Sequence, residues 1–113
     1  MNQIIEWAEF ELKENITEEN LLKVSQTLQT EFLDKQAGFM KRELLHKGGK
    51  KWVDLVHWES LEKANLAMEN AIKSETCMNY FHLMLPLDQS ISIWFVTCWT
   101  SSSNFRIFIS LFC

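Results

Sequence analysis

Hydrophobic and polar residues alternate along residues 4–12, the first clear pattern in the chain. An alternation with a period of two is typical of a β-strand that buries one face. The buried face would be mainly apolar with one carboxyl group among its members: Ile4, Glu6, Ala8, Phe10 and Leu12. We therefore predict a strand that carries Glu6 on its inner side.

The spacing of apolar residues changes to that of a helix after residue 16. Thr17 is a typical N-cap, and Glu18 and Glu19 follow near the positive end of the helix dipole. Apolar residues then recur at helical spacing, at Leu21, Val24, Leu28 and Phe32. We predict a helix over this stretch that stops at or before Gly38.

Residues 39–47 and 50–58 predict two strands joined at Gly48-Gly49, because paired glycines favour a tight hairpin turn. A plain two-residue turn would place Glu43 opposite Asp54, and like charges directly opposed are unfavourable. A three-residue loop with a glycine bulge would instead place Arg42 opposite Asp54.

We expect the bulged register, with an ion pair between the two strands. One face of the hairpin then collects large apolar side chains around that pair: Met40, Leu44, Trp52, Val56 and Trp58.

The third predicted strand is apolar on both sides, because Val53 and Leu55 alternate with the tryptophans and Val56. A strand of this kind is usually covered on both faces. The chain has 113 residues, of which 47% are hydrophobic, including 5 Trp and 8 Phe. Helices in so short a chain can cover one face, so we expect a second copy to cover the other.

Ser60 and Ser74 are N-cap candidates for two further helices, the first with an inner stripe of Leu61, Ala64, Met68, Ala71 and Ile72. Pro86 is expected to end the helical region, and residues 90–98 predict a fourth strand. The order β-α-β-β-α-β is typical of an α+β, ferredoxin-like domain.

We assign residues 1–99 to the ferredoxin-like domain and residues 100–113 to a C-terminal extension. The extension is apolar, but three serines, an asparagine and Arg106 interrupt it, which disfavours a membrane span. An extra strand, or an arm over the partner subunit, is the expected form.

Charge and cysteine content exclude several classes of protein. The net charge is −4, which disfavours a nucleic-acid partner. The three cysteines show neither metal-ligand spacing nor a disulfide framework, and His46 and His57 have no neighbours at metal-ligand spacing. We therefore expect no metal site. The N-terminal sequence lacks an export signal, which predicts a cytoplasmic location.

Three segments carry a resemblance to a known family: AGFMKRELL (37–45), KWVDLVHWES (51–60) and SETCMNYFHLM (74–84). Together they resemble the antibiotic biosynthesis monooxygenase-like family of the dimeric α/β-barrel superfamily, over about residues 3–97. The resemblance implies a homodimer whose sheets face each other, with the helices outside. It also implies a pocket between sheet and helices, in which family enzymes oxidise aromatic compounds with O2 and need no metal or flavin cofactor.

A related branch of the superfamily degrades haem with an asparagine on the first strand and a histidine on the second helix. Here the middle of the first strand is Glu6-Trp7-Ala8-Glu9, so the asparagine is missing. His82 alone is weak support, and haem degradation is the less favoured alternative.

Six residues are candidates for the pocket: Glu6, Arg42, Asp54, Trp52, Trp58 and Phe81. Arg42 and Asp54 would either form a structural ion pair or orient a polar substrate. Trp52 and Trp58 would either pack in the core or form an aromatic wall for a flat ligand.

Tyr80 and His82 are the candidate catalytic residues, because they can exchange protons or stabilise a phenolate near the pocket. The alternative is that both are hydrogen-bonded residues of the surface or the pocket rim. With them we expect a cofactor-independent monooxygenase acting on a small aromatic or polyketide-like compound. The alternative is a non-catalytic ligand-binding or stress-related protein of the same fold. An open cavity of several hundred Å³ with at least two converging polar groups would favour the enzyme.

Overall fold

An antiparallel sheet of five strands organises the protein, whose computed structural model describes residues 3–85, 92–98 and 105–109. The strands in chain order are β1 (Gln3–Glu11), β2 (Phe39–Gly48), β3 (Lys51–Trp58), β4 (Ser92–Cys98) and β5 (Phe105–Ile109). Their order in the sheet is β2-β3-β1-β4-β5. The first four strands have the order of a ferredoxin-like sheet, and β5 adds to it beside β4.

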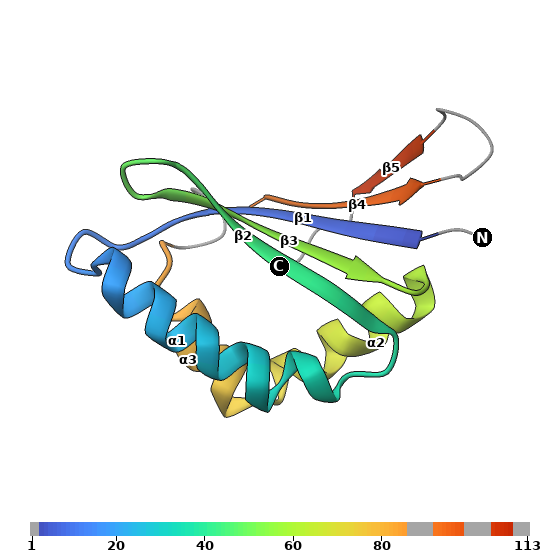
Figure 1. Cartoon of the computed structure of the whole chain (residues 1–113), viewed down its shortest axis with the longest axis horizontal. Helices are drawn as coiled ribbons and strands as arrows, with labels where there is room; N and C mark the ends of the chain where they lie inside the picture. The colour runs from blue at the N-terminus through green and yellow to red at the C-terminus, as the bar shows by residue number, and fades with distance from the viewer. Residues whose placement is uncertain (1–2, 86–91, 99–104, 110–113) are drawn as a thin grey trace.

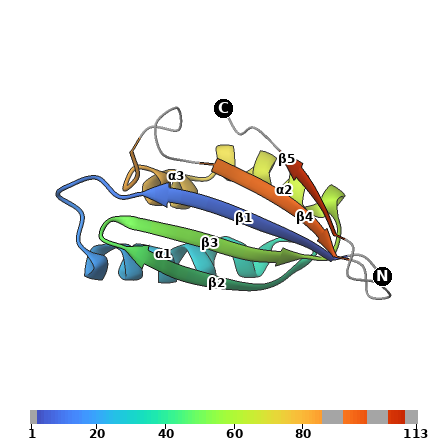
Figure 2. The ribbon, with the colours of Figure 1, turned by 90° about the horizontal axis from the view of Figure 1, so that it is seen from above.

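The helices of the described chain lie on one face of the sheet (Figure 1). They are α1 (Glu18–Glu31), a 3-10 turn η1 (Leu33–Lys35), α2 (Leu61–Ile72) and α3 (Glu75–Phe81). Figure 2 looks onto the opposite, helix-free face, with the strands in front and the helices behind them. The predicted β-α-β-β-α-β order and the α+β class are confirmed.

Alternation along β1 produces the predicted inner face. Ile4, Ala8 and Phe10 are buried beneath the helices, and Leu12 continues the same face just beyond the strand. β1 lies between β3 and β4, so its inner residues, Glu6 among them, face the centre of the helical layer.

The start of α1 is confirmed, and the helix ends before Gly38 as predicted. Thr17 caps the helix, and its side chain and that of Asn20 form a reciprocal capping box. The helix ends at Glu31, and η1 follows it. Gly38 lies beyond the helix and ends the turn that leads into β2, with a φ of +83°.

The predicted register of the β2-β3 hairpin is wrong by two residues. Arg42 is opposite Val56, and Asp54 is opposite Leu44. Gly48 pairs with Lys51, so a two-residue turn, Gly49-Lys50, takes the place of the expected three-residue loop.

The register shifts at two places along the hairpin, between His46 and Gly48 and between Phe39 and Lys41. The predicted and observed registers differ by two residues, which leaves the paired side chains on their predicted faces of the sheet, because side chains alternate with a period of two. Met40 falls within the second irregularity and is 48% exposed, so its predicted place on the inner face is wrong. Phe39 occupies that region instead, edge-on to Trp58.

Both later helices begin at the predicted serines. The Ser60 hydroxyl accepts from the Lys63 amide, and the Ser74 hydroxyl accepts from the Cys77 amide. Alanines form the buried stripe of α2, at Ala64, Ala67 and Ala71, whereas Ile72, predicted on the inner stripe, is 61% exposed. Pro86 lies outside the described residues.

The helix-free face carries Leu55 and Trp7, both partly buried, and Val53, which is only 1% exposed within the single chain. The chain itself therefore covers Val53, and this residue gives no argument for a partner. Within the described part of the chain, no helix is long and apolar enough to cross a membrane.

We predict that Gly38→Ala destabilises the protein more than Gly49→Ala. A Cβ atom at Gly38 would lie 2.6 Å from Cδ and 2.7 Å from Cβ of Lys63, in addition to the strain of a positive φ. At Gly49 the φ of +56° is also positive, but the space is open. We expect a loss of about 2–3 kcal/mol at Gly38 and about 1 kcal/mol at Gly49, measured by urea unfolding. Equal losses would show that the Lys63 contact is unimportant.

Candidate functional site

A cavity of about 360 Å³ lies between the inner face of the sheet and the helices. This volume is within the range of natural small-molecule sites, roughly 300–1,000 Å³. Its lining is mostly apolar, with side chains from β1, β3 and all three α-helices. Among the described lining residues, Glu6, Arg42, Asp54 and Tyr80 have side-chain oxygen or nitrogen atoms that can ionise, and Cys77 adds a thiol whose pKa burial raises to about 11.

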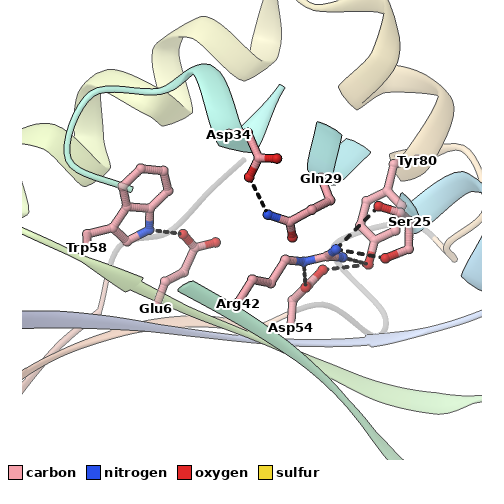
Figure 3. A network of polar contacts seen from close by, with 8 residues as sticks. All are labelled: Glu6, Ser25, Gln29, Asp34, Arg42, Asp54, Trp58 and Tyr80. Carbon is pink, nitrogen blue, oxygen red and sulfur yellow. Dashed lines mark hydrogen bonds and ion pairs between the residues drawn. The ribbon is translucent and has the colours of Figure 1, made fainter. Parts of the chain in front are cut away.

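Arg42, Asp54, Tyr80 and Ser25 form one hydrogen-bonded network at one end of the cavity (Figure 3). Arg42 Nε donates to Asp54 Oδ1 at 2.6 Å, and Tyr80 Oη donates to Asp54 Oδ2 at 2.5 Å. The two terminal guanidinium nitrogens donate to Ser25 Oγ at 2.7 Å and to Tyr80 Oη at 3.0 Å. Each nitrogen of Arg42 and each carboxylate oxygen of Asp54 therefore has a protein partner.

The predicted ion pair forms although its predicted register is wrong. Arg42 reaches Asp54 diagonally across the hairpin, since its direct neighbour on β3 is Val56. Diagonal neighbours on the same face lie within reach of long side chains. The preserved face, and not the exact register, is what brings the two charges together.

Burial and neighbouring charges hold Tyr80 and Arg42 in their protonated forms. Burial raises the pKa of Tyr80 well above its usual value, and the nearby charge of Asp54 raises it further. Burial, the largest single cause, would lower the pKa of Arg42, but its interactions with Asp54 and Tyr80 together outweigh burial and the net pKa is raised. Tyr80 therefore remains a neutral phenol and Arg42 a cation at physiological pH.

Glu6 lies apart from this network, beside Trp58 (Figure 3). Trp58 Nε1 donates to Glu6 Oε1 at 2.9 Å. Burial raises the pKa of the Glu6 carboxyl from 4.5 to about 7; the hydrogen bond from Trp58 opposes the shift, and the charge of Asp54 adds to it. At neutral pH the cavity therefore contains a carboxyl group that is near its midpoint of ionisation.

The structure brings most of the predicted pocket residues together. Glu6, Arg42, Asp54, Trp58, Tyr80 and Phe81 all line the cavity. Two predicted site residues do not. Trp52 is buried beyond the cavity, where its indole stacks on His46 at a centroid distance of 4.0 Å. His82 follows the end of α3 with an exposed side chain, away from the cavity lining.

Ser25 is the member of the network that the sequence analysis missed. It lies on the buried stripe of α1, between Leu21 and Leu28. A polar residue at an apolar position of a helical stripe is a usable signal, because a buried hydroxyl needs a partner. Within the described residues, no group of three or more His, Cys, Asp or Glu side chains could hold a metal ion.

No protein-family model and no curated protein matches the sequence. Several solved structures share the fold. SnoaB, a cofactor-independent oxygenase from Streptomyces nogalater, is 12% identical with a TM-score of 0.59, over 90% of this chain and 96% of SnoaB. The ActVA-Orf6 monooxygenase of Streptomyces coelicolor, solved with nanaomycin D, is 15% identical with a TM-score of 0.65, over 88% and 89% of the two chains.

A third structure, assigned as an antibiotic biosynthesis monooxygenase from Nitrosomonas europaea, is 10% identical with a TM-score of 0.57, over 97% of this chain and 91% of that one. Identities this low show the fold alone. The expectation from the sequence motifs is confirmed at that level: the chain has the fold of the antibiotic biosynthesis monooxygenase type.

We predict that Arg42→Met is strongly destabilising, because it leaves the Asp54 carboxylate buried without its ionic partner. The expected loss of unfolding free energy is about 3–5 kcal/mol. Lys47→Met is the control, since Lys47 pairs with Glu9 at 3.1 Å but the two side chains are 45% and 38% exposed. That loss should stay below about 1 kcal/mol. Similar losses in the two variants, measured by chemical denaturation, would contradict the described burial.

Proposed function

We propose that this protein is a cofactor-independent monooxygenase that oxidises a small aromatic or polyketide-like compound. The observation that carries the proposal is the 360 Å³ apolar cavity on which four polar side chains converge. A cavity of this size with a few placed polar groups suits a small organic ligand. The fold shared with oxygenases such as SnoaB supports the same class of reaction.

The proposed chemistry begins with loss of a proton from the substrate. The resulting anion is electron-rich enough to reduce O2 itself. One oxygen atom enters the substrate, and the other leaves as water. For oxidation of an activated CH2 group to a carbonyl, the substrate supplies all four electrons that O2 accepts. The protein then has to bind the substrate, take the proton and exclude bulk water.

The cavity residues fit these tasks. Trp58 provides an aromatic surface for a flat ring, and the Arg42-Asp54-Tyr80 network provides a polar end with fixed charges. His82 has no part in this proposal, because its exposed side chain is not in the cavity lining. A cytoplasmic location remains a prediction from the sequence.

We further propose that the protein acts as a homodimer that pairs through the helix-free face of the sheet. Leu45, on the edge strand β2, is 37% exposed on the helix-free face. Leu55 and Trp7, both partly buried, lie on this face too. Apolar side chains on a sheet face are commonly covered by a second layer. The fold shared with the antibiotic biosynthesis monooxygenase type supports the same arrangement.

The enzyme proposal is tested by filling the cavity from inside α2. Ala67 lines the cavity, whereas its neighbour Leu66 is 49% exposed on the outside of the helix. O2 consumption should be measured with a panel of phenols, naphthols and anthrones. We expect Ala67→Phe to abolish the turnover that the wild type shows and Leu66→Phe to leave it unchanged.

Circular dichroism would establish that both variants fold. Turnover that survives Ala67→Phe would place the chemistry elsewhere. Binding of aromatic compounds by the wild type without any O2 consumption would contradict the enzyme and favour the alternative, a ligand-binding protein.

The dimer proposal is tested by sedimentation velocity at micromolar concentration. We expect the wild type to sediment as a dimer and Leu55→Lys to sediment as a monomer, because the lysine would bury a charge between the two sheets. Leu66→Lys, on the outer side of α2, should remain dimeric. A monomeric wild type would contradict the proposal.

A further inference from the structure

The cavity contains two carboxyl groups with different hydrogen-bonding environments. Both oxygens of Asp54 accept hydrogen bonds, one from Arg42 and the other from Tyr80. A proton placed on Asp54 would break one of these bonds and leave Arg42 without its full counter-charge. Tyr80 is also unsuited to accept a proton, because its oxygen already carries one that it donates to Asp54.

Glu6 differs from Asp54 because only one of its carboxylate oxygens accepts a hydrogen bond from a described residue. Its Oε1 accepts from Trp58 Nε1, and no described residue donates a hydrogen bond to its Oε2. The side chain keeps some accessible surface and lines the cavity. A ligand stacked beside Trp58 would therefore meet a carboxylate oxygen with a free lone pair.

We propose that Glu6 is the proton acceptor of the cavity and that it binds the hydroxyl group of an uncharged phenolic or enolic ligand. This deepens the proposed function, on which its catalytic part rests. In the catalytic step the substrate O–H bond breaks, and its electron pair stays on the substrate oxygen. A new O–H bond forms at Glu6 Oε2, while Trp58 holds Oε1 in place.

The ionisation of Glu6 suits this role, since its pKa of about 7 is where a general base combines availability with basicity at neutral pH. Above pH 7 Glu6 is mainly ionised and can accept; below pH 7 it is mainly protonated and cannot.

The charges around the cavity favour an uncharged ligand. Among the described lining residues, Arg42 is the only cation, and Asp54, Tyr80 and Ser25 already occupy its nitrogens. A ligand carboxylate would lie near Glu6 and Asp54 without a counter-charge of its own. A neutral hydroxyl meets no such cost.

The experiment compares 2-naphthol with 2-methoxynaphthalene, which has the same rings but no hydroxyl hydrogen. Binding to the protein is measured by calorimetry between about pH 5.5 and 8.5, where 2-naphthol stays mainly neutral. For the wild type we expect the affinity for 2-naphthol to rise about fivefold to tenfold as the pH passes through 7, since a hydrogen bond to a carboxylate is stronger than one to a neutral acid. The affinity for the ether should stay flat or fall.

Glu6→Gln should remove the rise, because glutamine does not ionise. Glu9→Gln is the matched control on the same strand: its side chain pairs with Lys47, and Glu9 is not a lining residue of the cavity. This control should keep the rise. A rise that persists in Glu6→Gln, a rise for the ether equal to that for the naphthol, or no binding of 2-naphthol at any pH would each overturn the proposal.

A measurement of turnover distinguishes the role of Glu6 from the proposed oxygenase function. With a substrate that consumes O2, Glu6→Gln should lower kcat by about 10²–10⁴-fold and abolish the fall in rate on the acid side of pH 7. An unchanged kcat would limit Glu6 to binding and overturn its role as proton acceptor. If no substrate consumes O2 but the hydroxyl-dependent rise in affinity is present, the oxygenase proposal fails and the assignment of Glu6 as ligand acceptor stands.

Discussion

Helices α1, α2 and α3 cover charged side chains on the inner face of the sheet, and the cost of removing those charges from water governs the rest of the site. A buried charge must be paired, or it shifts its pKa until it is neutral. Both outcomes occur here within one cavity. Arg42 and Asp54 satisfy each other with help from Tyr80 and Ser25, whereas among the described residues Glu6 has only the indole of Trp58 as a hydrogen-bond partner.

The cavity therefore has one end whose protonation does not change near physiological pH and one end whose protonation does. The paired end keeps one charge state across the physiological range, because raised pKa values hold the protons of Tyr80 and Arg42. The Glu6 end can gain or lose a proton near pH 7. A fixed dipolar surface beside a titrating carboxyl is an arrangement suited to binding a polar ring and moving one proton.

Much of the fold could be predicted from local patterns, because alternation, N-caps and glycine turns act within a few residues. Alternation placed Glu6, Asp54 and Trp58 on the inner face correctly, and the same periodicity preserved that face when the hairpin register differed by two. The register itself depends on where the turn closes, at Gly49-Lys50, which the glycine pair alone does not specify.

The site was less predictable, because its geometry comes from long-range packing. Ser25 comes from α1, far from the hairpin in sequence, and reaches Arg42 only once α1 packs on the sheet. His82 lies next to cavity residues in sequence, but the end of α3 leaves its side chain exposed. The unusual ionisation of Glu6 also needs the finished cavity, since desolvation is its main cause.

The most direct test of this account is an NMR titration of the protein labelled with ¹³C at the glutamate carboxyl carbons, with the Glu6 signal identified by its loss in Glu6→Gln. We expect a midpoint of about 7 for that signal. A midpoint near the ordinary value of 4.5 would show that the carboxyl is well solvated and would contradict its burial between the sheet and the helices.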